Sequence, residues 1–195
     1  EIATKYQPDF KKQKSLRIYN KKYDAYFHNP YLLISAGTQY NKKNFREKLD
    51  IGDECKIFVD SGGYQLAMGT VNANKYTDEV ALKWSEANGN IFPILDRPAF
   101  SKLYDYDFSL KSSVNSAKYY QENRSKSDAY VLNVLQGENK EDMENWYKKI
   151  SPYKFEGWGF GGSKGNLALI GMAILTLLNN GEFDREKCKY LHIFG

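Results

Sequence analysis

Polar residues and glycines stand directly after short apolar runs at four places in the sequence. In chain order, the residues that follow the runs are Asp60, Asp96, Gln136 and the pair Gly161-Gly162. Carboxylates accept hydrogen bonds from N–H groups, an amide both donates and accepts, and glycines allow close approach to the backbone. If these positions converge, they form a pocket for a flat heterocycle with adjacent N–H donors and a carbonyl, such as guanine. A sugar or a phosphate fits the set less well, because it contains few fixed cations.

Two aromatic residues are placed to cover the faces of a flat ligand. Tyr64 lies shortly after Asp60, and Phe194 ends the last apolar run. Each feature has a plainer interpretation when it is taken alone. Asp60 with Ser61 and the following glycines is also typical of a turn in which Asp60 caps a helix, and Asp96 is also typical of a surface turn. The occurrence of such residues at successive run ends favours the pocket.

The apolar runs are short and rich in β-branched or aromatic residues, which is typical of strands buried on both faces. They cover residues 31–35, 56–59, 91–95, 130–135, 158–160 and 190–194. Helical patterns lie between several of them, and Thr77 and Gly89 are placed to begin and end one helix. Asn166 is placed to begin an apolar helix over residues 167–178, which we expect to be buried.

The alternation of strands and helices predicts a parallel α/β fold. A doubly wound sheet and a (β/α)8 barrel both fit this alternation. In a barrel, the carboxyl ends of all strands converge on one face, where barrel enzymes place their active sites. The sequence has no G-x-G-x-x-G pattern after a first strand, so it gives little support to a dinucleotide-binding sheet. The polar residues after the runs therefore favour the barrel.

Composition bounds the class of protein. The 195 residues are 42% hydrophobic and 15% aromatic, which supports one folded domain and excludes a disordered chain. Two cysteines are too few for a disulfide scaffold, and no signal peptide is evident, so we expect a reducing compartment, the cytoplasm. The longest apolar run, residues 167–178, falls short of the roughly 20 residues that a membrane span needs, and we expect no membrane partner.

The positive charge is concentrated near the N-terminus. The first thirty residues hold an excess of Lys and Arg that accounts for the net charge of +4, and tyrosines are interleaved with them. Such a segment is suited to a phosphate backbone and unpaired bases, although a solvated terminus is the plainer interpretation. We divide the chain into a basic segment, residues 1–28, and an α/β domain, residues 29–195. Because the chain starts at Glu1 and stops within an apolar run, we expect it to be a fragment.

Residues 58–65, Phe-Val-Asp-Ser-Gly-Gly-Tyr-Gln, resemble the D-S-G-G-[FY]-Q signature of the tRNA-guanine transglycosylases, the queuine and archaeosine enzymes. Further segments resemble the family's motifs in the same order: residues 29–38, 94–96, 134–137, 157–162 and 191–195. The resemblance runs from about residue 29 to the end of the chain. It implies a (β/α)8 barrel, truncated here after about six strands.

The resemblance implies a reaction in which guanine in a polynucleotide is exchanged for a 7-deazaguanine through a covalent glycosyl–enzyme intermediate. Asp60 would be the general acid/base, and Asp96 would bind the N–H edge of the base. Gln136 and the backbone of Gly161 and Gly162 would bind its carbonyl side. The use of two carboxylates in different roles resembles a retaining glycosidase.

Three more residues receive roles from the same resemblance. Tyr64 and Phe194 would sandwich the ring, and Ser61 would order the pocket. In the family, the nucleophilic aspartate and a zinc site of three cysteines and a histidine follow the next strand, which we expect beyond residue 195. Cys55 and Cys188 are single and widely spaced, so we expect no metal and no cofactor in this chain. On its own, the chain is expected to bind the base without completing the exchange.

One departure bears on the substrate. Asp96 is followed by Arg97, where the tRNA enzymes usually have an acid. In this respect the chain resembles phage and bacterial relatives that insert 7-deazaguanines into DNA. The expected partner is therefore tRNA or DNA. The alternative is a non-catalytic accessory subunit that binds guanine or nucleic acid. For either function, a homodimer or a heterodimer is among the expected partners. A third interpretation is an unrelated barrel enzyme in which the Asp-Ser-Gly-Gly segment is a coincidence.

Overall fold

The computed structural model describes residues 18–22, 28–99, 101, 103–125, 128–162, 165–184, 186 and 188–194. Within these ranges the chain forms an α/β fold with a six-stranded parallel sheet. The strands are β1 (Tyr31–Ser35), β2 (Lys56–Asp60), β3 (Ile91–Pro93), β4 (Tyr130–Leu135), β5 (Gly157–Phe160) and β6 (Tyr190–Ile193). Each expected apolar run forms a strand. The expected basic segment lies mostly outside the described residues.

Seven helices are present in the described ranges: α2 (Ala36–Gln39), α3 (Phe45–Lys48), α4 (Gly63–Ala67), α5 (Asp78–Asn88), α6 (Tyr106–Asn123), α7 (Lys140–Ile150) and α8 (Leu167–Asn179). The expected caps are confirmed. The Thr77 hydroxyl accepts a hydrogen bond from the Val80 N–H, and α5 ends at Gly89. Asn166 accepts from two N–H groups in the first turn of α8. These caps satisfy N–H groups that a helix terminus leaves without partners.

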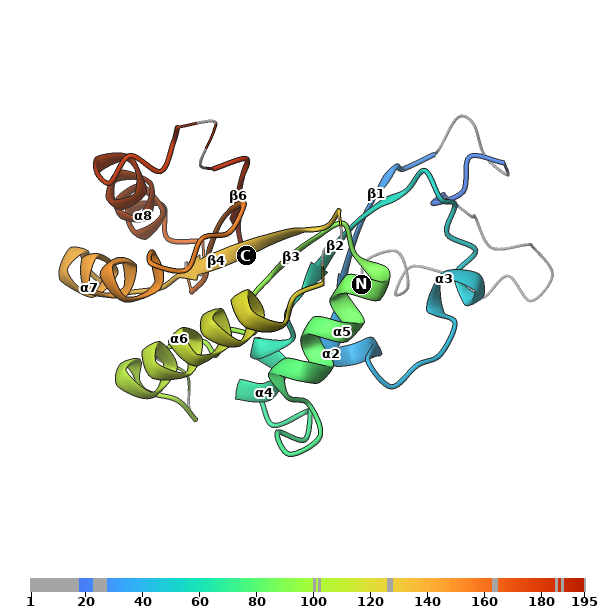
Figure 1. The fold of residues 1–195 in the computed structure, drawn as a ribbon, viewed down its shortest axis with the longest axis horizontal. Helices are drawn as coiled ribbons and strands as arrows, with labels where there is room; N and C mark the ends of the chain where they lie inside the picture. Colours follow the sequence, from blue (N-terminus) through green and yellow to red (C-terminus); the bar gives the residue numbers. More distant parts are fainter. Residues whose placement is uncertain are drawn as a thin grey trace.

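The strand order follows the chain order, from β1 to β6, with every neighbouring pair parallel. A doubly wound sheet reverses its order at a switch point, and the described sheet contains no such reversal. Helices α5 to α8 pack side by side in chain order, outside the curled sheet (Figure 1). The described part of the chain is therefore an α/β half-barrel of six parallel strands.

Aromatic contacts between distant strands demonstrate the curl of the sheet. Phe58 of β2 stacks on His192 of β6, with 4.1 Å between ring centroids, although three strands separate β2 from β6 in the sheet. Phe194 lies edge-on to both rings, at 6.2 Å from Phe58 and 4.7 Å from His192. Side chains on one face of a flat sheet could not meet across this span, because neighbouring strands are about 4.8 Å apart.

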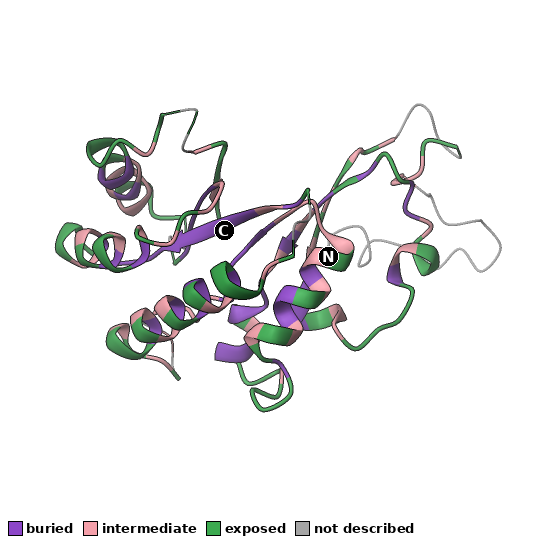
Figure 2. Cartoon of the chain, in the orientation of Figure 1, coloured by how far each residue is buried: buried purple, intermediate pink, exposed green. Residues whose placement is uncertain are grey.

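The core fills the layer between the sheet and the helices. Ile57, Val59, Phe92 and Trp146 are fully buried there, and burial runs along the strands and the inner faces of the helices (Figure 2). The expectation that the apolar helix α8 is buried holds for one face only. Its buried residues are Ala173, Thr176 and Leu177, and Leu167 is 80% exposed, because the packing against α7 covers a single face. None of the described helices combines the length and the apolarity needed to cross a bilayer.

Candidate active site

Three expected site residues meet at the carboxyl ends of β2, β3 and β4. The Ser61 hydroxyl donates to Asp96 Oδ1 at 2.8 Å, and Gln136 Nε2 donates to Asp96 Oδ2 at 2.9 Å. Ser61 and Gln136 are buried, and Asp96 is half-buried. Because parallel strands end on the same side, residues that are far apart in the sequence come within hydrogen-bond distance here. The expectation that these positions converge is confirmed.

Glycines after β2 allow the backbones of three strand ends to touch. A Cβ atom on Gly63 would lie 1.7 Å from the carbonyl oxygen of Asp96, and one on Gly62 would lie 2.6 Å from the backbone of Gly37. Gly62 also has a φ of 83°, in the left-handed region that glycine adopts without strain. The two glycines of the Asp-Ser-Gly-Gly segment are thus explained by packing. They bring Ser61 within reach of Asp96.

Ser61 takes the local capping role that the plainer interpretation gave to Asp60. The N-cap residue of α4 is Gly62, and the Gly63 N–H donates to the Ser61 hydroxyl at 3.2 Å. The buried phenol of Tyr76 donates to the Ser61 carbonyl at 2.5 Å. The carbonyl and the hydroxyl of Ser61 therefore both have fixed partners, which holds the hydroxyl toward Asp96.

Gln136 connects the end of β4 to the loop after β3. Its Nε2 also donates to the Arg97 carbonyl at 3.3 Å, and its Oε1 accepts from the Ala99 N–H at 2.6 Å. The side-chain amide is thereby oriented, because its donor and acceptor ends have different partners. Any ligand that uses the Gln136 amide would have to share or replace these contacts. Asp96 has two oxygens with about four acceptor positions, so it can accept further N–H donors.

Burial raises the pKa of Asp96 to about 6, and the charge of Asp60 adds to the rise, while the hydrogen bond from Ser61 opposes it. Asp60 is half-buried at the end of β2, in register with Ser35 of β1. Two carboxyl groups that affect each other in one site are an arrangement that acid/base chemistry uses.

The expected glycines lie at the end of β5. Gly161 is buried, and its N–H donates to the Leu135 carbonyl at 3.0 Å. A Cβ atom at this position would lie 3.6 Å from Gln136 Cγ and 3.8 Å from Asp96 Oδ2, so Gly161 borders the cluster. Gly162 is exposed, has a φ of 83°, and would place a Cβ atom in open space. Of the two, Gly161 is the residue that the structure brings to Asp96.

The two expected ring-covering residues have different surroundings. Tyr64 stands in the first turn of α4, which follows β2, and is 62% exposed. Phe194 is half-buried in the aromatic group with Phe58 and His192, and its ring fills the space that a side chain at Gly159 would need. A sandwich of a ligand between Tyr64 and Phe194 stays a prediction.

Sequence reasoning missed three contributors to the site. Tyr76 anchors Ser61, Gly37 receives the close approach of Gly62, and Ser35 donates to Gln65 Oε1 at 3.1 Å. Nothing in the sequence around Tyr76 marks it as part of a site. Ser35 ends the first apolar run and Gly37 follows it. Their position at a strand end, within the segment 29–38 that resembles a family motif, was the available signal.

The described residues contain no group of three or more His, Cys, Asp and Glu side chains arranged to hold a metal ion. No protein-family model matches the chain, and no curated protein is similar to it at a significant level.

Proposed function

We propose that the chain is the base-binding part of a transglycosylase that exchanges guanine in a polynucleotide for a 7-deazaguanine. The observation that carries this proposal is the paired donation of Ser61 and Gln136 to Asp96, with Gly161 beside it. This arrangement orients a carboxylate whose remaining acceptor positions suit the adjacent N–H groups of guanine. The resemblance of residues 58–65 to the transglycosylase signature agrees with it.

Each residue has one task in the proposed reaction. Asp96 accepts from the N–H edge of the base, and Gln136 and Gly161 lie on the side of its carbonyl. Asp60 gives a proton to the leaving base and takes one from the entering base, which suits a carboxyl group beside a second carboxyl. The aspartate that attacks the ribose C1′ is expected beyond residue 195, on a further strand of a (β/α)8 barrel.

A non-catalytic role is the second candidate, and one observation favours it. The amide of Gln136 already has partners at both ends, Asp96 and Arg97 on one side and Ala99 on the other. A site that only holds a base needs this rigidity and does not need a nucleophile. In this case the chain belongs to an accessory subunit that binds guanine or nucleic acid.

The test is base exchange with radiolabelled guanine, catalysed by the natural full-length protein that contains this chain. We would supply tRNA, duplex DNA and single-stranded DNA in parallel, and compare Asp60→Asn with the exposed control Asp107→Asn. We expect label to enter one polymer, a loss of at least about 100-fold with Asp60→Asn, as for removal of a general acid/base, and no loss with Asp107→Asn.

Calorimetry with guanine separates the alternatives. Guanine binding without exchange in any polymer would favour the accessory subunit. Absence of both binding and exchange would contradict both candidates. An equal loss of exchange in Asp60→Asn and Asp107→Asn would contradict the role of Asp60 as acid/base.

A further inference from the structure

Behind the candidate site, α5 and α6 meet the end of β3 through one buried hydroxyl. Ser116 of α6 is fully buried, and its Oγ lies 2.7 Å from the Leu95 carbonyl oxygen. The same Oγ is in hydrogen-bond contact with Oδ1 of Asp78, the first residue of α5. Leu95 directly precedes Asp96, so this contact holds the backbone that carries the central carboxylate of the site.

If Asp78 is ionised, this junction has one hydrogen for two hydrogen bonds. A serine hydroxyl has one hydrogen, and both of its neighbours here, a carboxylate and a carbonyl, are acceptors. With Asp78 ionised, Ser116 can donate to only one of them, and the other contact brings two oxygen atoms together without a hydrogen. With Asp78 protonated, its O–H donates to Ser116 and the Ser116 O–H donates to Leu95. Only the protonated form satisfies both short contacts.

The surroundings of Asp78 have opposing effects on its charge. Burial raises its pKa, and the hydrogen bond with Ser116, the positive charge of Arg97 and a backbone N–H at the start of α5 lower it. Arg97 is engaged with α6, where its Nη1 donates to Ser112. The buried phenols of Tyr76 and Tyr120 are further titratable groups near enough to Asp78 for its charge to raise their pKa values. The net direction is a raised pKa, so the surroundings favour the proton that the geometry requires.

We propose that Asp78 keeps a proton in the folded protein at pH values where an exposed aspartate is ionised, and that the protonated carboxyl, through Ser116, holds the end of β3 in place. Asp78 is then a positioning residue for Asp96. The proton and the hydrogen-bond chain do not depend on the proposed function. Only the consequence for base binding rests on it.

Asp78→Asn is the decisive variant, because its amide N–H can replace the carboxyl O–H at every pH. As the pH rises through the folded-state pKa, the wild-type protein loses its proton and the associated stability, whereas Asp78→Asn does not. We therefore expect the Tm of Asp78→Asn, relative to wild type, to rise between about pH 4 and pH 8. Each kcal/mol of stability that the wild-type protein loses with the Asp78 proton corresponds to about 2–4 °C in this difference. Titration of Asp96 occurs in both proteins and cancels in the difference.

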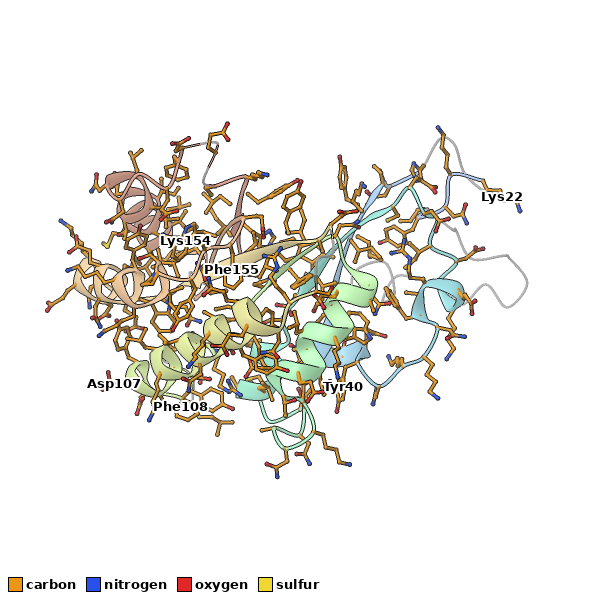
Figure 3. The ribbon with its side chains drawn as sticks, in the orientation of Figure 1. Lys22, Tyr40, Asp107, Phe108, Lys154 and Phe155 are labelled. Atoms are coloured by element: carbon orange, nitrogen blue, oxygen red, sulfur yellow. The ribbon has the colours of Figure 1, made fainter. Side chains whose placement is uncertain are left out.

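Two outcomes of this measurement would overturn the proposal. If the Tm of Asp78→Asn falls relative to wild type as the pH rises, the ionised carboxylate is the form that the fold uses, as a helix N-terminus would favour. If the difference does not change with pH, Asp78 does not keep its proton above the range of an exposed aspartate. Asp107→Asn is the matched control, because Asp107 is an exposed acid in the first turn of α6 (Figure 3). We expect its Tm difference to lack the rise.

Two further variants test the link to β3. Asp78→Ala cannot donate and Ser116→Ala cannot relay, so both are expected to speed hydrogen exchange of the Ile94 amide, which bonds the Leu132 carbonyl. Asp78→Asn is expected to keep the wild-type rate. Equal rates in Asp78→Ala and Asp78→Asn would contradict the chain of hydrogen bonds. The Tm of the double variant Ser116→Ala/Asp78→Asn can be compared with that of Ser116→Ala across the same pH range. If this difference still rises with pH as it does without Ser116→Ala, the chain of hydrogen bonds is also contradicted.

Guanine affinity provides a separate readout for the proposed function. If wild type binds guanine, we expect Asp78→Ala to weaken the affinity several-fold and Asp78→Asn to retain it. If wild type does not bind guanine, the proposed function fails, and the Tm and exchange measurements still decide the role of Asp78.

Discussion

At the scale of single residues, the site depends on one carboxyl group with an unfavourable environment for its charge. Asp96 accepts from Ser61 and Gln136, yet burial and the neighbouring Asp60 raise its pKa to about 6. Its two hydrogen-bond donors directly follow β2 and β4, so the contacts that orient Asp96 also connect the ends of these strands to the loop after β3.

Asp96→Asn is expected to change stability in a pH-dependent manner. Because the folded-state pKa lies above the unfolded value, the wild-type contribution is present below the unfolded pKa and is lost as the pH rises through about 6. The stability of Asp96→Asn relative to wild type should therefore increase by roughly 1–3 kcal/mol between about pH 4 and pH 8. Urea unfolding of both proteins at several pH values measures this difference. A constant difference would show that Asp96 titrates normally.

At the scale of elements, the contact between the start of α4 and the end of β3 is the tightest feature of the site. Gly63 lies directly against the Asp96 carbonyl, and Gly62 lies against Gly37 at the end of β1. These contacts set the distances between strand ends, and the hydrogen bonds of Ser61 follow from them. The segments after β1, β2 and β3 therefore contact one another through backbone atoms, and there is no space for a side chain at Gly62 or Gly63.

Gly63→Ala is expected to destabilise the protein by at least about 3 kcal/mol, because its Cβ atom would lie 1.7 Å from a backbone oxygen and the strand end must move. Gly171→Ala in α8 is the control. A Cβ atom there meets nothing within 4 Å, so the substitution should stabilise by about 0.5–1 kcal/mol through helix propensity. Thermal unfolding of both variants checks the pair. A mild effect at Gly63 would mean that α4 can shift freely.

The sequence could predict the elements and the central part of the site. The short apolar runs and the Thr77 and Asn166 caps are local signals, and they led to the observed strands and helix starts. The meeting of Asp96 with Gln136 followed from their positions at strand ends. The approach of Gly63 to Asp96 could not be predicted, because it depends on how far β2 and β3 are displaced along their axes.

Contacts that cross the fold were equally inaccessible from the sequence. The hydrogen bond from Tyr76 to Ser61 and the stacking of Phe58 on His192 join segments whose separation depends on the curl of the sheet. Neither residue type marks such a contact locally. The exposure of one face of α8 was missed for a related reason, since an apolar pattern indicates what a helix prefers to contact and not whether a neighbour is present.

At the scale of the whole molecule, the half-barrel is held in its curled form by aromatic side chains on its inner face. Phe58, His192 and Phe194 connect β2 with β6 without any hydrogen bond between these strands. Burial also lowers the pKa of His192, which favours the neutral ring in this group. The curl brings the strand ends to a common side, so these rings contribute to the site from a distance.

Phe58→Ala is expected to cost about 2–4 kcal/mol of unfolding free energy, because a half-buried ring with two aromatic partners is removed. The control Phe108→Ala removes a ring that is 50% exposed, on the outside of α6, and should cost about 1 kcal/mol or less. Chemical denaturation gives both values. If the two variants lose equal stability, the rings on the inner face do not hold the curl.

The backbone contact between Gly63 and Asp96 has a consequence for how the site responds to change. Tyr64 is the residue next to Gly63, so a backbone motion that carries its ring toward a ligand also moves the peptide that contacts the Asp96 carbonyl. Contact of Tyr64 with the face of a ligand ring would then depend on the position of Asp96, which would contact the edge of the ring. Substitutions at Tyr64 and Asp96 should consequently have non-additive effects on ligand affinity, and evolution would adjust the two positions together.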